Sequence, residues 1–113
     1  MSSEPTPRTE LVPGTLTLLV LRVLESGPLH GYAIAQRISA VSGEVLRVEE
    51  GSLYPALQKM LRKGWLRAEW GLSDTKRRVR SYQLTAAGRK QLESERAGYD
   101  HVNRAIQAVL KLA

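Results

Sequence analysis

The segment from residue 49 to residue 66 constrains the fold most, because its pattern predicts a short helix that ends directly before a strand. Ser52 is the predicted N-cap, since its hydroxyl can accept a hydrogen bond from an amide of the first turn. Pro55 then falls within the first turn, where its missing N–H removes no helical hydrogen bond. Gly64 stands where a C′ glycine ends a helix, and Trp65 opens the strand.

This predicted helix has one apolar face and one polar face. The apolar face would pack on the core and consists of Leu53, Leu57, Met60 and Leu61. The outward face is polar and cationic and consists of Ser52, Pro55, Gln58, Lys59 and Arg62. A short helix of this kind, followed by an Arg-rich hairpin, is suited to entering a groove of DNA.

The hairpin that follows concentrates positive charge. Residues 65–70 and 78–84 predict strands, and residues 71–77, which include Asp74, have the composition of a turn. The cations of the tip and the second strand are Lys76, Arg77, Arg78 and Arg80. Their mutual repulsion adds nothing to folding, whereas a phosphate backbone relieves it. Solvated charge runs are usually disordered tails, but strand patterns flank this one, so we interpret it as a DNA or RNA backbone contact.

Composition limits the function classes. At 113 residues the chain has the length of one domain, and its formal net charge is +6. That charge favours nucleic acid or an anionic membrane as partner, although a merely soluble basic protein has the same balance. The absence of cysteine excludes disulfides, zinc fingers and thiol catalysis. The longest apolar run, residues 16–24, is too short to span a bilayer, and residues 1–7 do not resemble a signal peptide, so we expect a cytoplasmic protein.

The remaining segments before the central helix are less distinctive. Residues 1–10 are polar, contain two prolines, and are predicted to form a disordered tail. Residues 30–41 have the apolar spacing of a second helix, and residues 45–48 predict a short strand.

Two helices carry more apolar surface than one small domain can cover. Residues 13–25 are apolar on nearly all sides, so a partner subunit could cover part of that helix, at Leu18 and Leu21. Thr85 is the predicted cap of a final helix over residues 86–111. That helix carries a seam of about three heptads, formed by Leu92, Tyr99, Val102, Ile106 and Val109. We predict that the seam forms a homodimer interface.

Four motifs, in matching order and spacing, closely resemble the PadR family of bacterial transcriptional regulators. They are Gly27-Pro28-Leu29-His30-Gly31-Tyr32, Gly51-Ser52-Leu53-Tyr54-Pro55-Ala56-Leu57, Lys63-Gly64-Trp65-Leu66, and Arg77-Arg78 with Tyr82-Gln83-Leu84-Thr85-Ala86-Ala87-Gly88. The likeness covers residues 11–113 and is closest to the short branch, which has one C-terminal helix. It implies a mainly α-helical winged helix-turn-helix with a two- to three-stranded β wing. Residues 11–85 would bind DNA, and residues 86–113 would form a dimerisation helix.

The resemblance also implies a mode of action. A homodimer would repress transcription from a near-palindromic operator on double-stranded DNA. A small-molecule effector would bind between the long helices and change the spacing of the recognition helices. No cofactor and no metal are expected.

The predicted DNA contacts differ in chemistry. Gln58 offers a donor and an acceptor to a base edge, and Lys59 can reach a base or a phosphate. Hydroxyls near the helix start suit phosphate. Tyr32 could contact phosphate in the same way, which the resemblance supports, or could simply pack. The predicted set is Tyr32, Ser52, Tyr54, Pro55, Gln58, Lys59, Lys76, Arg77, Arg78 and Arg80. The competing interpretation, a solvated helix face, is weakened by the adjoining wing.

Other functions have less support. A protein-interaction module could dock an acidic partner on the same basic face, but it would need no base readout. RNA recognition would need exposed stacking aromatics, which are nearly missing. No thiol, His–carboxylate constellation or phosphate-binding glycine loop can be placed, so we predict no enzyme and no catalytic residues. Trp65 is expected in the core below the recognition helix, and Trp70 either exposed at the wing base or in an effector pocket.

Overall fold

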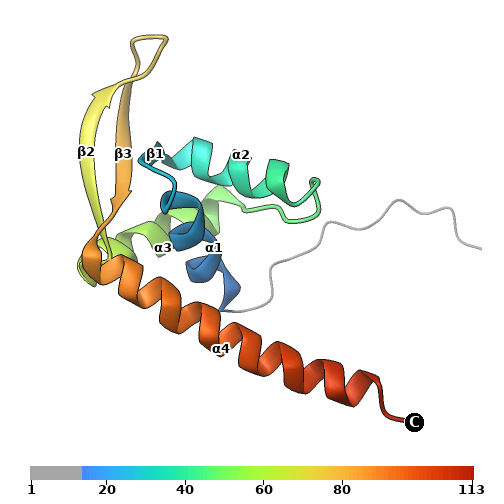
Figure 1. Cartoon of the computed structure of the whole chain (residues 1–113). Coiled ribbons are helices and arrows are strands. Elements are labelled where there is room, and N and C mark those ends of the chain that lie inside the picture. Colours follow the sequence, from blue (N-terminus) through green and yellow to red (C-terminus); the bar gives the residue numbers. More distant parts are fainter. Residues whose placement is uncertain (1–13) are drawn as a thin grey trace, which may run out of the picture.

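The computed structural model describes residues 14–113, so the predicted tail of residues 1–10 lies outside the described part of the chain. Figure 1 shows short helices beside a projecting hairpin, with a long helix that starts at the hairpin base. The elements are α1 (Thr15–Leu24), β1 (Leu29–His30), α2 (Gly31–Val41), α3 (Glu50–Arg62), β2 (Leu66–Leu72), β3 (Arg78–Leu84) and α4 (Ala86–Leu110). This order confirms the predicted winged helix-turn-helix fold, mainly α-helical with a small β wing.

The wing is a three-stranded antiparallel sheet in the order β1-β3-β2. β2 and β3 pair along their whole length, and β1 adds Leu29 opposite Tyr82. Sequence reasoning missed β1, because two residues are too few to show a period. The strand predicted over residues 45–48 does not form: only Leu46 makes an isolated β-bridge, and its N–H donates to Ser42 Oγ at 3.0 Å.

α3 begins earlier than predicted. Glu49 occupies the N-cap position, so Ser52 lies within the first turn and Pro55 lies inside the helix, beyond that turn. The earlier start places Glu50 in the first turn, where a negative charge is favourable at the positive end of the helix dipole. The predicted C-terminal signal is confirmed, since Gly64 follows the C-cap with a φ of +77°.

The core lies where the three short helices meet the base of the sheet and the start of α4. Its buried side chains are Val20, Leu21, Leu24, Ile34, Ile38, Leu53, Leu57, Met60, Leu66, Tyr82, Leu84 and Leu92. Trp65 packs against this cluster and is partly buried. Leu21 and Leu92, both predicted at a dimer interface, have 0% exposure within the single chain. That part of the prediction is corrected, because a partner cannot reach side chains that the chain's own core covers.

The N-terminus of α4 is fixed to the base of the wing. Thr85 caps the helix as predicted, because its Oγ1 accepts from the Gly88 N–H at 3.0 Å. The Thr85 N–H donates to the Trp65 carbonyl at 3.0 Å, and its hydroxyl donates to the Gly64 carbonyl at 2.7 Å. Beyond Leu92 the helix passes α1, where Arg96 forms an ion pair with Glu25 at 4.0 Å, and its C-terminal end projects from the domain (Figure 1). Within residues 14–113, no helix is both long and apolar enough to cross a membrane.

Candidate nucleic-acid interface

α3 presents its polar face to solvent. Its apolar face is buried at Leu53, Leu57 and Met60, as the spacing predicts. The exposed side chains on the other side are Ser52, Tyr54, Pro55, Gln58, Lys59 and Arg62. Every residue of this helix that was predicted to contact DNA is therefore accessible from solvent.

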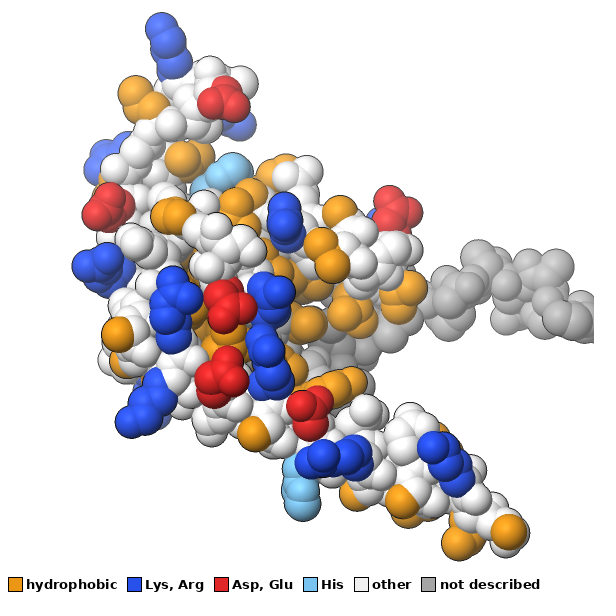
Figure 2. All heavy atoms as spheres, in the orientation of Figure 1, with side chains coloured by type: hydrophobic (Ala, Val, Ile, Leu, Met, Phe, Trp, Pro, Cys, Tyr) orange, Lys and Arg blue, Asp and Glu red, His pale blue; other side chains and the backbone are white. Residues whose placement is uncertain are grey.

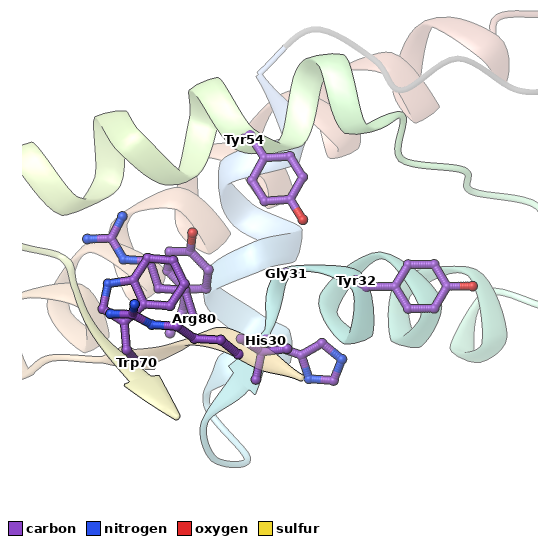
Figure 3. Close-up of a pocket in the computed structure, with 9 residues that line it drawn as sticks. His30, Gly31, Tyr32, Tyr54, Trp70 and Arg80 are labelled. Atoms are coloured by element: carbon purple, nitrogen blue, oxygen red, sulfur yellow. The ribbon is translucent and has the colours of Figure 1, made fainter. Parts of the chain in front are cut away.

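α2 and α3 approach each other closely at Gly31 and Tyr54. A Cβ at Gly31 would lie 2.9 Å from Tyr54 Oη and 3.0 Å from Tyr54 Cε1. The missing side chain of Gly31 thus lets the Tyr54 ring lie against the first residue of α2 (Figure 3). Tyr32 is 60% exposed and extends along α2, away from Trp70 (Figure 3). The purely structural packing considered for Tyr32 is therefore not what the structure shows.

Hydrogen bonds around Ser73 order the tip of the wing. The Ser73 N–H donates to the Arg77 carbonyl and the Lys76 N–H donates to the Ser73 carbonyl, both at 2.8 Å. The Arg77 N–H donates to Ser73 Oγ at 3.1 Å. Lys76 adopts a left-handed φ of 60° in this turn. The turn leaves the Lys76 and Arg77 side chains exposed, and Figure 2 shows cationic side chains along the wing and at its tip.

Arg78 and Arg80 lie along the stem of the wing, over Trp70. Trp70 on β2 is directly opposite Arg80 on β3. The Cζ of Arg78 lies 4.6 Å from the centroid of the Trp70 ring, and the Cζ of Arg80 lies 5.9 Å from it. Both distances are within the range of cation–π attraction. Sequence reasoning missed this cluster, because the contact depends on the register between two strands that were predicted separately.

One hollow of about 400 Å³ connects the wing stem with the starts of α2 and α3. Its lining includes His30, Tyr32, Tyr54, Trp70, Arg78 and Arg80. Tyr82 lies at its base, where burial raises the pKa of the hydroxyl while the neighbouring Arg80 cation opposes that rise. Phenol hydroxyls and guanidinium groups both donate hydrogen bonds, so the hollow is chemically suited to anionic oxygen atoms.

The structure brings some predicted DNA contacts together and leaves others apart. Tyr32, Tyr54, Arg78 and Arg80 share the lining of the hollow. The remaining ones lie outside that lining, elsewhere on α3 or at the wing tip: Ser52, Pro55, Gln58, Lys59, Lys76 and Arg77. Across the described residues, no group of His, Asp or Glu side chains is arranged to hold a metal ion.

A second hollow, of about 380 Å³, lies between α1 and α4. Its apolar lining includes Leu18, Tyr99, Val102 and Ile106. The three α4 side chains are 47%, 55% and 50% exposed, in that order. Val109 is 70% exposed farther along α4, and Figure 2 shows apolar side chains along the far end of this helix. Of the predicted interface residues other than Leu21 and Leu92, the four on α4 are exposed, and Leu18 is partly buried beside this hollow.

A helix-turn-helix whose exposed polar helix is followed by a basic antiparallel wing defines a winged-helix DNA-binding protein. Comparison with known protein families identifies the family within this class. The model of the "Transcriptional regulator PadR-like family" matches residues 20–94. The chain belongs to the PadR-like family of transcriptional regulators, a family of DNA-binding regulators rather than enzymes.

The chain is also similar to individual proteins and solved structures. An uncharacterized 37.1 kDa protein in transposon TN4556 of Streptomyces fradiae is 46% identical over 78 residues, which are 69% of this chain and 21% of that protein. The chain therefore spans only about a fifth of that relative's length. A PadR-like transcription factor from Bacteroides fragilis has 26% identity and a TM-score of 0.68, over 85% of this chain and 90% of that one. The structure of a transcriptional regulator from Clostridium thermocellum, at 24% identity, shares the fold with a TM-score of 0.79, over 87% of this chain and 95% of that one.

Proposed function

We propose that this regulator is a homodimeric repressor that binds a near-palindromic operator, with α3 in the major groove and the wing on the DNA backbone. The observation that carries the proposal is an exposed polar face on α3 together with a cationic wing, which meet at one hollow lined by Tyr54, Arg78 and Arg80. In this proposal residues 11–85 form the DNA-binding unit and residues 86–113 form the dimerisation helix. A protein that regulates transcription acts where the DNA is, in the cytoplasm.

The two parts of the surface have different tasks in this proposal. Gln58 and Lys59 project from the exposed side of α3, at the positions from which a recognition helix reaches base edges. Ser52 and Pro55 lie on the same side, nearer the start of the helix. Tyr54 contacts phosphate oxygens together with the hydroxyl of Tyr32, while the wing cations clamp the backbone. Base contacts supply the sequence preference, and phosphate contacts supply most of the affinity.

The second copy of the chain covers the hollow between α1 and α4. Leu18, Tyr99, Val102, Ile106 and Val109 form the contact surface. A lone helix that exposes this apolar row in water gains little stability without a partner. Dimerisation places two recognition helices at a fixed separation, which is why the operator is near-palindromic.

Release from the operator by a small-molecule effector is what the family resemblance implies. A small molecule bound between the two α4 helices would alter the separation of the recognition helices. The apolar hollow beside Tyr99 is the position in this chain where such a ligand would enter.

The decisive experiment recovers duplexes bound by the purified protein from a random DNA library and sequences them. The proposal expects enrichment of one near-palindromic sequence, and a promoter carrying it should lose transcription in vitro when the protein is added. Recovered duplexes without a common sequence would contradict sequence-specific binding. Increased transcription from that promoter would show an activator instead of a repressor.

A further inference from the structure

An aromatic–cationic ladder runs along one face of the wing stem. From the core outward, the residues of this ladder are Tyr82, Arg80, Trp70 and Arg78. The Cζ of Arg80 lies 5.9 Å from the Tyr82 ring centroid and the same distance from the Trp70 centroid, so this guanidinium lies between two rings. Arg78 lies over Trp70 at 4.6 Å. Figure 3 shows the Trp70 and Arg80 side chains together on the wing.

This arrangement changes how the two arginines can bind an anion. An unrestrained arginine loses much rotamer freedom when it binds, and that loss opposes the contact. A guanidinium that lies over an aromatic ring has already lost part of that freedom, yet its N–H edges can still reach oxygen atoms. Lys76 and Arg77 lie in the exposed turn instead and have no ring beside them. The stem cations are therefore better positioned than the tip cations.

Trp70 contributes little to the core itself. Its side chain is 59% exposed, and it lies outside the buried cluster that joins the helices to the sheet. Its position on the wing is therefore better explained by the arginines that it touches. It also lines the hollow that Tyr32 and Tyr54 share, so it faces the same surface as the start of α3.

We propose that Trp70 is a positioning residue for DNA binding, which holds Arg78 and Arg80 toward the hollow so that the stem of the wing makes the ordered phosphate contacts. This inference rests on the proposed DNA-binding function. It assigns to Trp70 an indirect role, through the arginines, and no contact with a base.

A double-mutant cycle tests the indirect role. The four proteins are the natural chain, Trp70→Leu, Arg78→Ala and the double variant, each measured for binding to a random duplex. Trp70→Leu should weaken binding roughly five- to thirtyfold for each wing that contacts the duplex, because each wing loses two exposed cation–π contacts. In the Arg78→Ala background the same change should cost much less, with only the contact to Arg80 left to lose. Equal costs in the two backgrounds would overturn the inference, because Trp70 would then act independently of Arg78.

Two further variants separate positioning from general damage to the wing. Leu72→Ala removes a 72% exposed apolar side chain that pairs directly opposite Arg78, and it should leave the affinity nearly unchanged. Trp70→Phe keeps an aromatic ring and should restore most of the affinity lost in Trp70→Leu. A Leu72→Ala loss as large as that of Trp70→Leu, or no rescue by phenylalanine, would overturn the inference. Failure of the natural chain to bind any duplex would instead contradict the proposed function.

Discussion

Gly31 determines where the Tyr54 ring can lie. A methyl group at Gly31 would meet the hydroxyl end of Tyr54, which is a flexible side chain and can move aside. We expect Gly31→Ala to change the free energy of unfolding by no more than about 1 kcal/mol, since alanine also favours the helix. DNA affinity should nevertheless fall severalfold, because Tyr54 is displaced from its proposed phosphate contact.

The matched variant for this prediction is Tyr54→Phe, which removes the hydroxyl without adding a steric conflict. Fluorescence anisotropy with labelled duplex should show a similar loss for both variants. Full affinity in both would show that the Tyr54 hydroxyl does not contact DNA.

Gly88 presents the opposite case, because its neighbour cannot move aside. A Cβ at Gly88 would collide with the backbone carbonyl of Trp65 at the base of the wing. We expect Gly88→Ala to lower the free energy of unfolding by about 2 kcal/mol or more, since relief requires a backbone shift. Urea denaturation measures this loss. Gly51→Ala is the control, because that position is also helical but a Cβ there meets nothing within 4 Å, and its stability should be unchanged or higher.

At the residue scale, the sequence predicts roles that depend only on nearby backbone. It does not predict contacts between residues that are far apart in the chain. Gly64 and Thr85 have the predicted roles at the ends of helices, because each depends only on nearby backbone. Ser52 does not cap α3, since residues upstream also adopt helical dihedral angles. The contact of Trp70 with the arginines needed the strand register, which residue patterns alone do not define.

At the element scale, the two halves of α4 differ in burial. Leu92 belongs to the predicted heptad seam but is buried in the chain's own core, whereas Val102 and Ile106 are about half exposed. Replacing Val102 and Ile106 with glutamate should produce folded monomers, because charge is added only to the proposed dimer surface. Analytical ultracentrifugation measures the assembly, and circular dichroism measures the fold.

Leu92→Ala is the contrasting variant for α4. It should lower the free energy of unfolding by about 2–5 kcal/mol, the usual cost of truncating a fully buried leucine, without a direct effect on the dimer surface. Dimers that persist in the double glutamate variant would locate the interface elsewhere.

Gly98 lies in the part of α4 that faces α1. It lines the hollow between α1 and α4, and a Cβ there would meet nothing within 4 Å in its own chain. The open space agrees with a second chain approaching this side of α4.

The sequence predicted the order and type of the helices and of the two long strands, because each is long enough to show its period. It missed β1 because Leu29 and His30 form a strand only by pairing with β3, which lies far along the chain. Residues 45–48 have strand-like composition but lack a partner strand in the sheet. Whether each of these two short segments forms a strand therefore depends on pairing with a distant part of the chain.

At the scale of the whole molecule, substitutions in α3 and in the wing should have different effects on DNA affinity. Gln58→Ala should cost on the order of 1–3 kcal/mol on the selected operator and little on a random duplex, because it removes a base contact. Arg77→Ala should weaken binding to both duplexes alike, because a phosphate contact carries no sequence preference. If Gln58→Ala weakened binding to both duplexes equally and Arg77→Ala weakened binding only to the operator, the proposed assignment of base contacts to α3 and phosphate contacts to the wing would be wrong.

The central claim is that a dimer with two cationic wings binds the DNA backbone, and its most direct test is the salt dependence of duplex affinity. Each phosphate contact by lysine or arginine releases counterions, so the logarithm of the association constant falls linearly with the logarithm of salt concentration. We predict a slope of several units for both the operator and a random duplex, with the operator bound more tightly at every salt concentration. A flat plot would contradict backbone contact by the wings, and with it the account of this surface as the DNA-binding site.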